Sequence, residues 1–187
     1  MKAKDNVVTK GFSGALDRTI TFIQKAGKTY VGKFRRKVTD APTEKMLAVR
    51  TRFSASVIYA KKAIKSLATR ALYLAGRLPG QTAFNVAVAD AYNAPTVDGI
   101  QTTNYHGAIG NTITVDANDD FKVVSVVVSI HDGAGNLVEQ GNAVTQEDEP
   151  GWLYTVTQAN ATLSGSKISA VATDMPGNTG TLETIIP

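Results

Sequence analysis

Hydrophobic residues recur at steps of three and four through the middle of the first half of the chain. They are Met46, Val49, Phe53, Val57, Ala60, Ile64, Leu67 and Ala71. This spacing places them on one stripe of an α-helix. Neither glycine nor proline interrupts residues 44–75, and Asp40 or Thr43 is suited to cap the first turn. We therefore predict one long helix, or two in tandem, over this stretch.

The segment before this helix has the pattern of a β-hairpin. Two β-prone runs, residues 19–23 and 29–34, flank Lys25-Ala26-Gly27-Lys28, where Gly27 suits the turn. Residues 1–16 are polar and basic and are expected to form an irregular arm. After Gly76-Arg77-Leu78-Pro79-Gly80, residues 81–93 return to helical spacing and predict a second, short helix.

From residue 96 onward the period becomes that of strands. Short apolar runs alternate with clusters of Gly, Asn and Asp, which indicates about seven strands and an immunoglobulin-like β-sandwich. Trp152 and Tyr154 fall on the same face of one strand and are expected to fill its core. The sequence therefore predicts an α+β protein: a basic hairpin and helical region over residues 1–95, then an Ig-like domain over residues 96–187.

The two halves of the chain have opposite charge. Before Gly80 the chain carries eighteen Lys and Arg against four Asp and Glu, and after it two against twelve. Between residues 43 and 77 the only acid is Glu44, whereas ordinary solvated helices mix the two signs. Such an asymmetry is typical of a segment that binds a polyanion or an oppositely charged protein surface.

The candidate binding residues are the bases of the hairpin end and the helix. They are Arg35, Arg36, Lys37, Arg50, Lys61, Lys62 and Lys65. They could contact phosphates of nucleic acid without sequence preference. They could equally dock on the acidic half of a neighbouring copy, and the sequence leaves both alternatives open.

A weaker candidate site is a calcium loop. Asp116, Asn118 and Asp120 have the spacing with which an EF-hand loop opens, and Asp174 could complete a site at the edge of the sandwich. However, Phe121 stands where that loop needs glycine, and Val127 where it needs glutamate. A turn is the simpler interpretation of these residues.

The residue set argues against an enzyme. The chain has no cysteine, which excludes disulfides, thiolate metal sites and cysteine nucleophiles. Its two histidines are isolated in β-prone segments, and no G-x-S-x-G motif accompanies them. We expect no cofactor and no small-molecule substrate. We also expect no signal peptide and no membrane span, and hence a cytoplasmic protein or one that is part of an assembled particle.

Two stretches carry a family resemblance. The hairpin with Arg35-Arg36-Lys37, Pro42-Thr43-Glu44 and Arg50-Thr51-Arg52-Phe53 resembles an uncharacterised protein family of Bacteroidota genomes and their mobile elements. The tail is similar to bacterial Ig-like domains through Asp119-Asp120-Phe121, Asp132-Gly133-Ala134-Gly135-Asn136, Trp152-Leu153-Tyr154 and residues 172–178. The resemblance implies this architecture and no activity.

The leading functional hypothesis is a structural or assembly protein, such as a virion, filament or lattice subunit. Its basic helical region would engage the acidic sandwich of the next copy, and head-to-tail contacts of this kind form rings or fibres. The alternative is a sequence-nonspecific nucleic-acid-binding protein.

Overall fold

The computed structural model describes residues 9–25, 27–35, 41–146 and 151–187. The chain divides into two compact units, Met1–Leu47 and Ala48–Pro187. Among the described residues, helices combine with three antiparallel sheets. The α+β class is confirmed at this level.

The first unit contains a three-stranded antiparallel sheet in the order β1-β2-β3. The predicted hairpin is confirmed as β2 (Ile20–Lys25) and β3 (Lys28–Lys33). β1 (Gly14–Leu16) was not expected, because its connection to β2 lacks the usual glycine. Instead, Asp17 and Arg18 both take positive φ, at 47° and 48°, the conformation that a type I′ turn requires at its two central residues.

The predicted long helix consists of two helices in tandem, α1 (Glu44–Ala63) and α2 (Leu67–Ala75). The Thr43 hydroxyl accepts a hydrogen bond from the Met46 amide at the start of α1, while Asp40 lies outside the described residues. Ser66 caps α2 by accepting from the Thr69 amide. The predicted short helix is confirmed as α3 (Ala83–Tyr92), with Thr82 as its cap.

The three helices share a small core. It consists of Ala60, Tyr73, Ala83, Val86 and Ala87, with Phe121 packed against it. The Tyr73 and Phe121 rings lie 4.7 Å apart between centroids. Phe121 lies in the connection between a strand of one four-stranded sheet and a strand of the other. Its packing therefore joins α2 and α3 to these sheets within the second unit.

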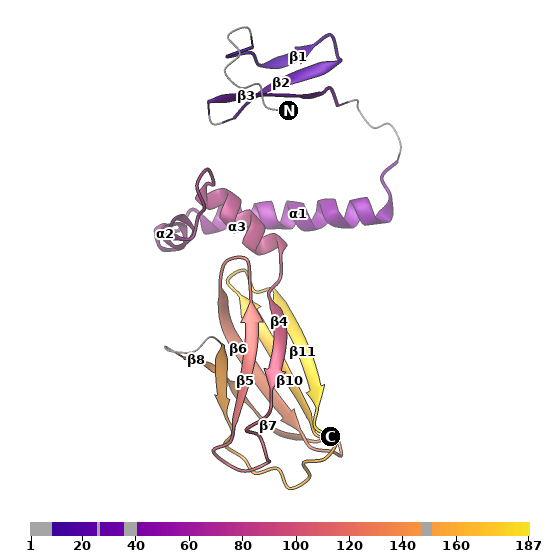
Figure 1. Ribbon diagram of the computed structural model, residues 1–187, viewed down its shortest axis with the longest axis vertical. Helices are drawn as coiled ribbons and strands as arrows, with labels where there is room; N and C mark the ends of the chain where they lie inside the picture. The colour runs from indigo at the N-terminus through magenta and orange to yellow at the C-terminus, as the bar shows by residue number, and fades with distance from the viewer. Residues whose placement is uncertain (1–8, 26, 36–40, 147–150) are drawn as a thin grey trace. The chain divides into compact units, whose positions relative to one another are not determined.

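The remaining strands form two four-stranded antiparallel sheets, ordered β11-β10-β6-β7 and β4-β5-β9-β8 (Figure 1). The first contains β6 (Val123–His131), β7 (Leu137–Asn142), β10 (Lys167–Asp174) and β11 (Thr179–Ile185). The second contains β4 (Thr96–Gln101), β5 (Thr112–Asn118), β8 (Val144–Thr145) and β9 (Trp152–Thr155). Non-consecutive neighbours such as β6 and β10 show that the chain crosses between the two sheets.

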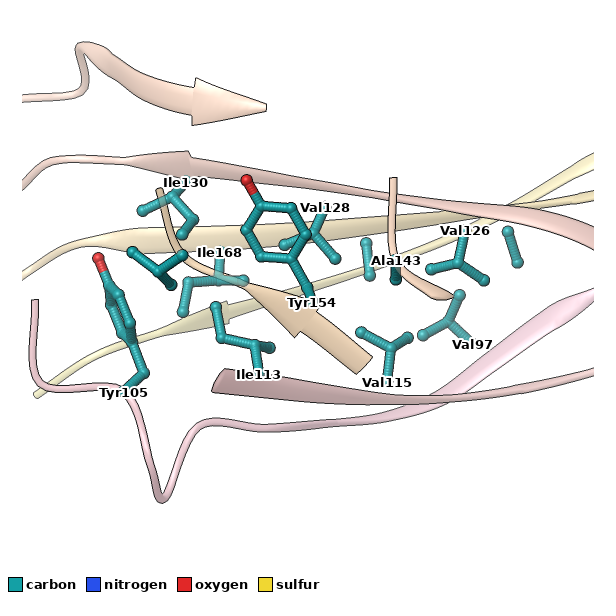
Figure 2. Close-up of a cluster of buried hydrophobic side chains, with 13 residues drawn as sticks. Val97, Tyr105, Ile113, Val115, Val126, Val128, Ile130, Ala143, Tyr154 and Ile168 are labelled. Atoms are coloured by element: carbon teal, nitrogen blue, oxygen red, sulfur yellow. The ribbon is translucent and has the colours of Figure 1, made fainter. Parts of the chain in front are cut away.

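The two sheets enclose a single hydrophobic core (Figure 2). Alternate residues of β6 and β10 are buried, as the period of a strand requires: Val126, Val128 and Ile130, and Ile168, Ala170 and Ala172. Tyr154 is buried among them, as predicted, and Trp152 packs against the same core. In the turn after β6, the Asp132 carboxylate accepts hydrogen bonds from the Ala134 and Asn136 backbone amides.

The strands of the two four-stranded sheets begin directly after Pro95, where the hydrophobic pattern of the sequence changes from helical to strand spacing. The compact units nevertheless divide after Leu47, because α3 packs closely on the end of the sheets. The Asn178 side-chain amide reaches the carbonyls of Asp90, Ala91 and Asn93 at 3.4–3.5 Å. No described helix is both long and apolar enough to span a bilayer.

Candidate functional site

The basic residues of α1 and the segment after it lie at the surface. Arg50, Lys61, Lys62 and Lys65 are all exposed. In the part of the chain that the structure describes, the one ion pair joins Lys167 to Glu183, far from α1 in the sequence. None of these four cations forms an ion pair with a described residue of the sandwich. Arg35 is exposed as well, whereas Arg36 and Lys37 lie outside the described residues.

Large apolar side chains are interspersed with these bases. On α1, the exposed fractions are 48% for Leu47, 54% for Val49 and Phe53, and 67% for Ile58. On α2, Leu67 is 81% exposed. The first half of the predicted apolar stripe is thus uncovered, and only the last turns of α1 bury Ser56 and Ala60. We call these exposed cationic and apolar side chains of α1 and α2 together the α1–α2 surface.

Two arginines of the same region stand beside apolar side chains. Arg70 and Arg77, together with Ile64, Leu74 and Phe84, line a pocket of about 450 Å³. Arg52 instead lies over the Tyr92 ring, 4.7 Å from its centroid, in a cation–π contact. Arg52 is therefore engaged within the chain, while Arg70 and Arg77 border an open hollow.

The residues of the predicted calcium loop have separate partners. Asp116 accepts from the Gln101 amide at 3.1 Å, and Asp120 accepts from the Asn93 amide at 2.6 Å. Asn118 donates to Asp98. Asp174 lies elsewhere, in a group to which neither Asp116 nor Asp120 belongs among the described residues. The structure therefore does not assemble the four residues into one site.

A different acidic group forms where α3 meets the ends of the sheets. Asp90, Asp119 and Asp174 each place one carboxylate oxygen within 4.8 Å of the other two. Asp90 comes from the end of α3, Asp119 from the β5–β6 connection and Asp174 from the end of β10. Asp90 is fully buried and Asp174 is 3% exposed. We call these three residues the junction acids.

Hydrogen bonds hold one oxygen of Asp90, one oxygen of Asp119 and both oxygens of Asp174. Tyr73 donates to Asp90 Oδ2 at 2.5 Å. Asp119 Oδ2 accepts from the Phe121 and Lys122 amides at 3.1 and 2.9 Å. The backbone amide and the side-chain amide of Asn178 both donate hydrogen bonds to the Asp174 carboxylate. The other oxygens of Asp90 and Asp119 are buried with no hydrogen-bond partner among the described residues.

Burial and mutual repulsion govern the electrostatics of this group. Burial is the main cause that raises the pKa of Asp90 to about 7, and the charges of Asp119 and Asp174 raise it further. Burial also raises the pKa of Asp174, against the hydrogen bonds from Asn178 and Gly177. The pKa of Tyr73 is raised mainly by its own burial and next by Asp90. The group thus resists holding three negative charges at once.

Sequence reasoning found Asp174 but missed Asp90 and Asp119 as its companions. One signal was present: Asp90 follows Ala83, Val86 and Ala87 on the buried face of α3. An acid on the apolar stripe of a helix is rarely left without a partner. For Asp119 no such signal exists, because an Asp in a polar connection is usually a turn residue.

No protein-family model and no curated protein matches the chain. Among solved structures, an engineered protein from the Northeast Structural Genomics Consortium is 17% identical, with a TM-score of 0.35, over 58% of this chain and 27% of that one. A hypothetical protein from Pyrococcus horikoshii is 10% identical, with a TM-score of 0.28, over 51% of this chain and 87% of that one. The chain thus spans about a quarter of the length of the engineered protein. Likenesses this low carry no argument about function.

Proposed function

We propose that the protein is a non-enzymatic structural or assembly protein, a subunit of a virion, filament or lattice type. It associates with further copies of itself through the basic helical region and an acidic Ig-like domain. Membership of the Bacteroidota and mobile-element family that its motifs resemble is part of the same proposal.

The Ig-like assignment of residues 96–187 is supported by strand order. If β4 to β11 are lettered A, B, C, C′, D, E, F and G, the two sheets read A-B-E-D and G-F-C-C′. Immunoglobulin-like sandwiches pair their strands in this way. Such domains commonly present surfaces to other proteins, but the fold alone specifies no activity.

One observation carries the assembly proposal: the α1–α2 surface combines exposed apolar side chains with cations that have no ion-pair partner among the described residues. A monomer gains nothing from leaving Phe53 and Ile58 in water, since burial of such a side chain is worth roughly 1.5–3 kcal/mol. Exposed apolar groups flanked by charge are typical of protein–protein contact sites.

A second copy offers a surface of matching charge. Twelve acids and two bases follow Gly80 in the sequence, and Asp98 and Asp120 are exposed on the described part of that half. A contact between the basic α1–α2 surface of one copy and the acidic sandwich of the next is heterologous. Such a contact can repeat from copy to copy. Electrostatic complementarity of this kind sets the orientation and speeds the encounter.

The test is the size of the purified full-length chain, measured by light scattering in nuclease-treated samples at low and high salt. We expect particles larger than a monomer, which shrink when Phe53 and Ile58 are both changed to Ser. The triple charge reversal Lys61→Glu, Lys62→Glu and Lys65→Glu is expected to act in the same way. Lys122→Glu, an exposed base in the acidic half, is the matched control. A wild-type protein that stays monomeric at high concentration would contradict the proposal.

The alternative, sequence-nonspecific nucleic-acid binding, is favoured by the same unpaired bases. Phosphate contacts weaken steeply with salt because binding releases counterions. A salt titration of binding to a DNA duplex of mixed sequence, compared with the Arg50→Ala, Lys61→Ala, Lys62→Ala and Lys65→Ala variant, tests it. Phosphates do not account for exposed Phe53 and Ile58, and for this reason assembly is the first proposal.

A further inference from the structure

The junction acids are arranged as ligands around a common centre. Their three nearest carboxylate oxygens lie within 4.8 Å of one another. Calcium binds carboxylate oxygens at 2.3–2.6 Å, so two ligands on opposite sides of the ion are separated by roughly 4.6–5.2 Å. All three oxygens therefore fit within one coordination sphere.

A second observation points to a ligand. Asp90 is fully buried, and its Oδ1 has no hydrogen-bond partner among the described residues. Asp119 Oδ1 is likewise buried and without a partner. A buried polar atom without a partner costs free energy, and a buried charge costs more. The two open oxygens belong to the same three-residue group. A cation would satisfy both, as would a proton shared between the Asp90 and Asp119 side chains, which are close enough for a hydrogen bond.

The surroundings fix the ligands in place, and a small pocket borders Asp90. The other oxygens of Asp90 and Asp119 are held by Tyr73 and by backbone amides, which orients the side chains as ligating carboxylates require. A pocket of about 120 Å³ is lined by Asp90, Asp120 and Phe121. Calcium takes six to eight oxygen ligands, so water molecules would have to supply the remaining ones.

We propose that Asp90, Asp119 and Asp174 bind one calcium ion. The ligands are all hard oxygens, and no histidine belongs to the group. Magnesium keeps several of its own waters and demands a strict octahedron, so a buried cluster of protein carboxylates suits calcium better. The site shares Asp174 with the predicted calcium set but contains none of Asp116, Asn118 and Asp120. It does not depend on the assembly proposal.

The consequence would be structural. The ligands come from the end of α3, the β5–β6 connection and the end of β10, three segments that are distant in sequence. Calcium would tie them together and cancel their mutual repulsion. The competing state has a proton on Asp90 and no ion, and calcium dependence separates the two.

The experiment is calorimetric titration of the full-length chain with calcium chloride near pH 7.5, together with thermal unfolding in calcium and in EDTA. We expect one ion per chain and, at a hundredfold excess over Kd, a midpoint raised by about 5 °C or more. Asp90→Asn keeps the shape of the side chain and removes its charge. It should weaken calcium binding about tenfold or more, and Asp119→Asn should do the same.

Asp116→Asn is the matched control, because it removes an acid of the sequence-predicted set outside the group, and it should bind calcium as the wild type does. The proposal is overturned if the wild type binds no calcium and its midpoint is equal in calcium and EDTA. It is also overturned if Asp116→Asn abolishes binding while Asp90→Asn and Asp119→Asn do not. Magnesium titration in parallel tests the choice of ion, and equal affinity for magnesium would refute it. Because these readouts concern one chain, their failure leaves the assembly proposal standing.

Discussion

The Tyr73 hydroxyl donates a hydrogen bond to Asp90 Oδ2 across 2.5 Å, and both side chains have an exposed fraction of zero. This bond joins α2 to α3 inside the helical core. The Tyr59 and Tyr73 hydroxyls are 3.0 Å apart, which extends the network to α1. A buried polar chain of this kind is stabilising only while every member has its partner.

Tyr73→Phe is therefore expected to destabilise the protein. The substitution leaves both oxygens of Asp90 without a protein partner, and a buried unsatisfied group costs about 1–3 kcal/mol. Urea denaturation in EDTA measures the change in the free energy of unfolding. Tyr59→Phe is the matched control. Because Tyr59 is only partly buried, this variant should lose less free energy of unfolding than Tyr73→Phe. Equal losses would show that Asp90 does not depend on Tyr73.

Asn160 holds the far end of the sandwich together. Its side-chain amide donates to the Tyr105 hydroxyl at 3.1 Å and to Ser166 Oγ at 2.8 Å. Asn160 and Ser166 are both buried. We expect Asn160→Ala to lower the free energy of unfolding by about 2 kcal/mol, because two buried hydroxyls lose a donor. Gln158→Ala, at an exposed neighbouring position, should change it little; a comparable loss there would contradict this account.

Gly180 marks a close approach of two backbone segments. A Cβ atom at this position would lie 2.0 Å from the Pro95 carbonyl oxygen, just before β4. Gly180→Ala must therefore push the start of β4 away from β11, at a cost of about 1–3 kcal/mol. Gly32→Ala is the control, because it meets nothing within 4 Å and has no positive φ. Thermal unfolding compares the variants, and an unchanged midpoint for Gly180→Ala would show that the strands are not so close.

Asp132 should make the turn after β6 sensitive to acid. Its pKa is lowered from 3.8, first by the Asn136 side chain and then by backbone amides. Because the folded pKa lies below the unfolded value, its contribution to stability is present above pH 3.8 and is lost as the pH falls through the folded value. The stability difference between wild type and Asp132→Ala should then shrink below about pH 4.

The difference between the two proteins isolates Asp132 from the other acids. An NMR titration of the Asp132 carboxyl group provides the direct measurement. A midpoint at or above the ordinary value for aspartate would contradict the depressed pKa. So would a stability difference that stays constant with pH.

Local patterns in the sequence were sufficient for the elements whose signals are local. Alternation of apolar and polar residues identified strands such as β6 and β10, and steps of three and four identified α1 and α3. The Thr43 cap could be predicted because it depends on residues only three positions apart. The strand β1 was missed because Asp17 and Arg18 adopt positive φ without the glycine that usually announces it.

The opposite charges of the two halves also follow from the sequence alone, since they require only counting. The sequence could not tell which side of α1 is covered. Val49 and Phe53 have the spacing of buried residues and are nevertheless 54% exposed, while Ser56 is buried. Helical spacing shows which residues share a face, but only tertiary packing decides whether another element covers that face.

The junction acids were likewise decided by tertiary structure. Asp90 and Asp174 are 84 positions apart in the numbering, and Asp119 lies between them in a connection that looks like any other turn. Their meeting depends on α3 packing against the ends of β5 and β10, which local propensity does not encode. Residues on separate segments become a site only when the fold places their charges within a few ångströms and removes the water between them.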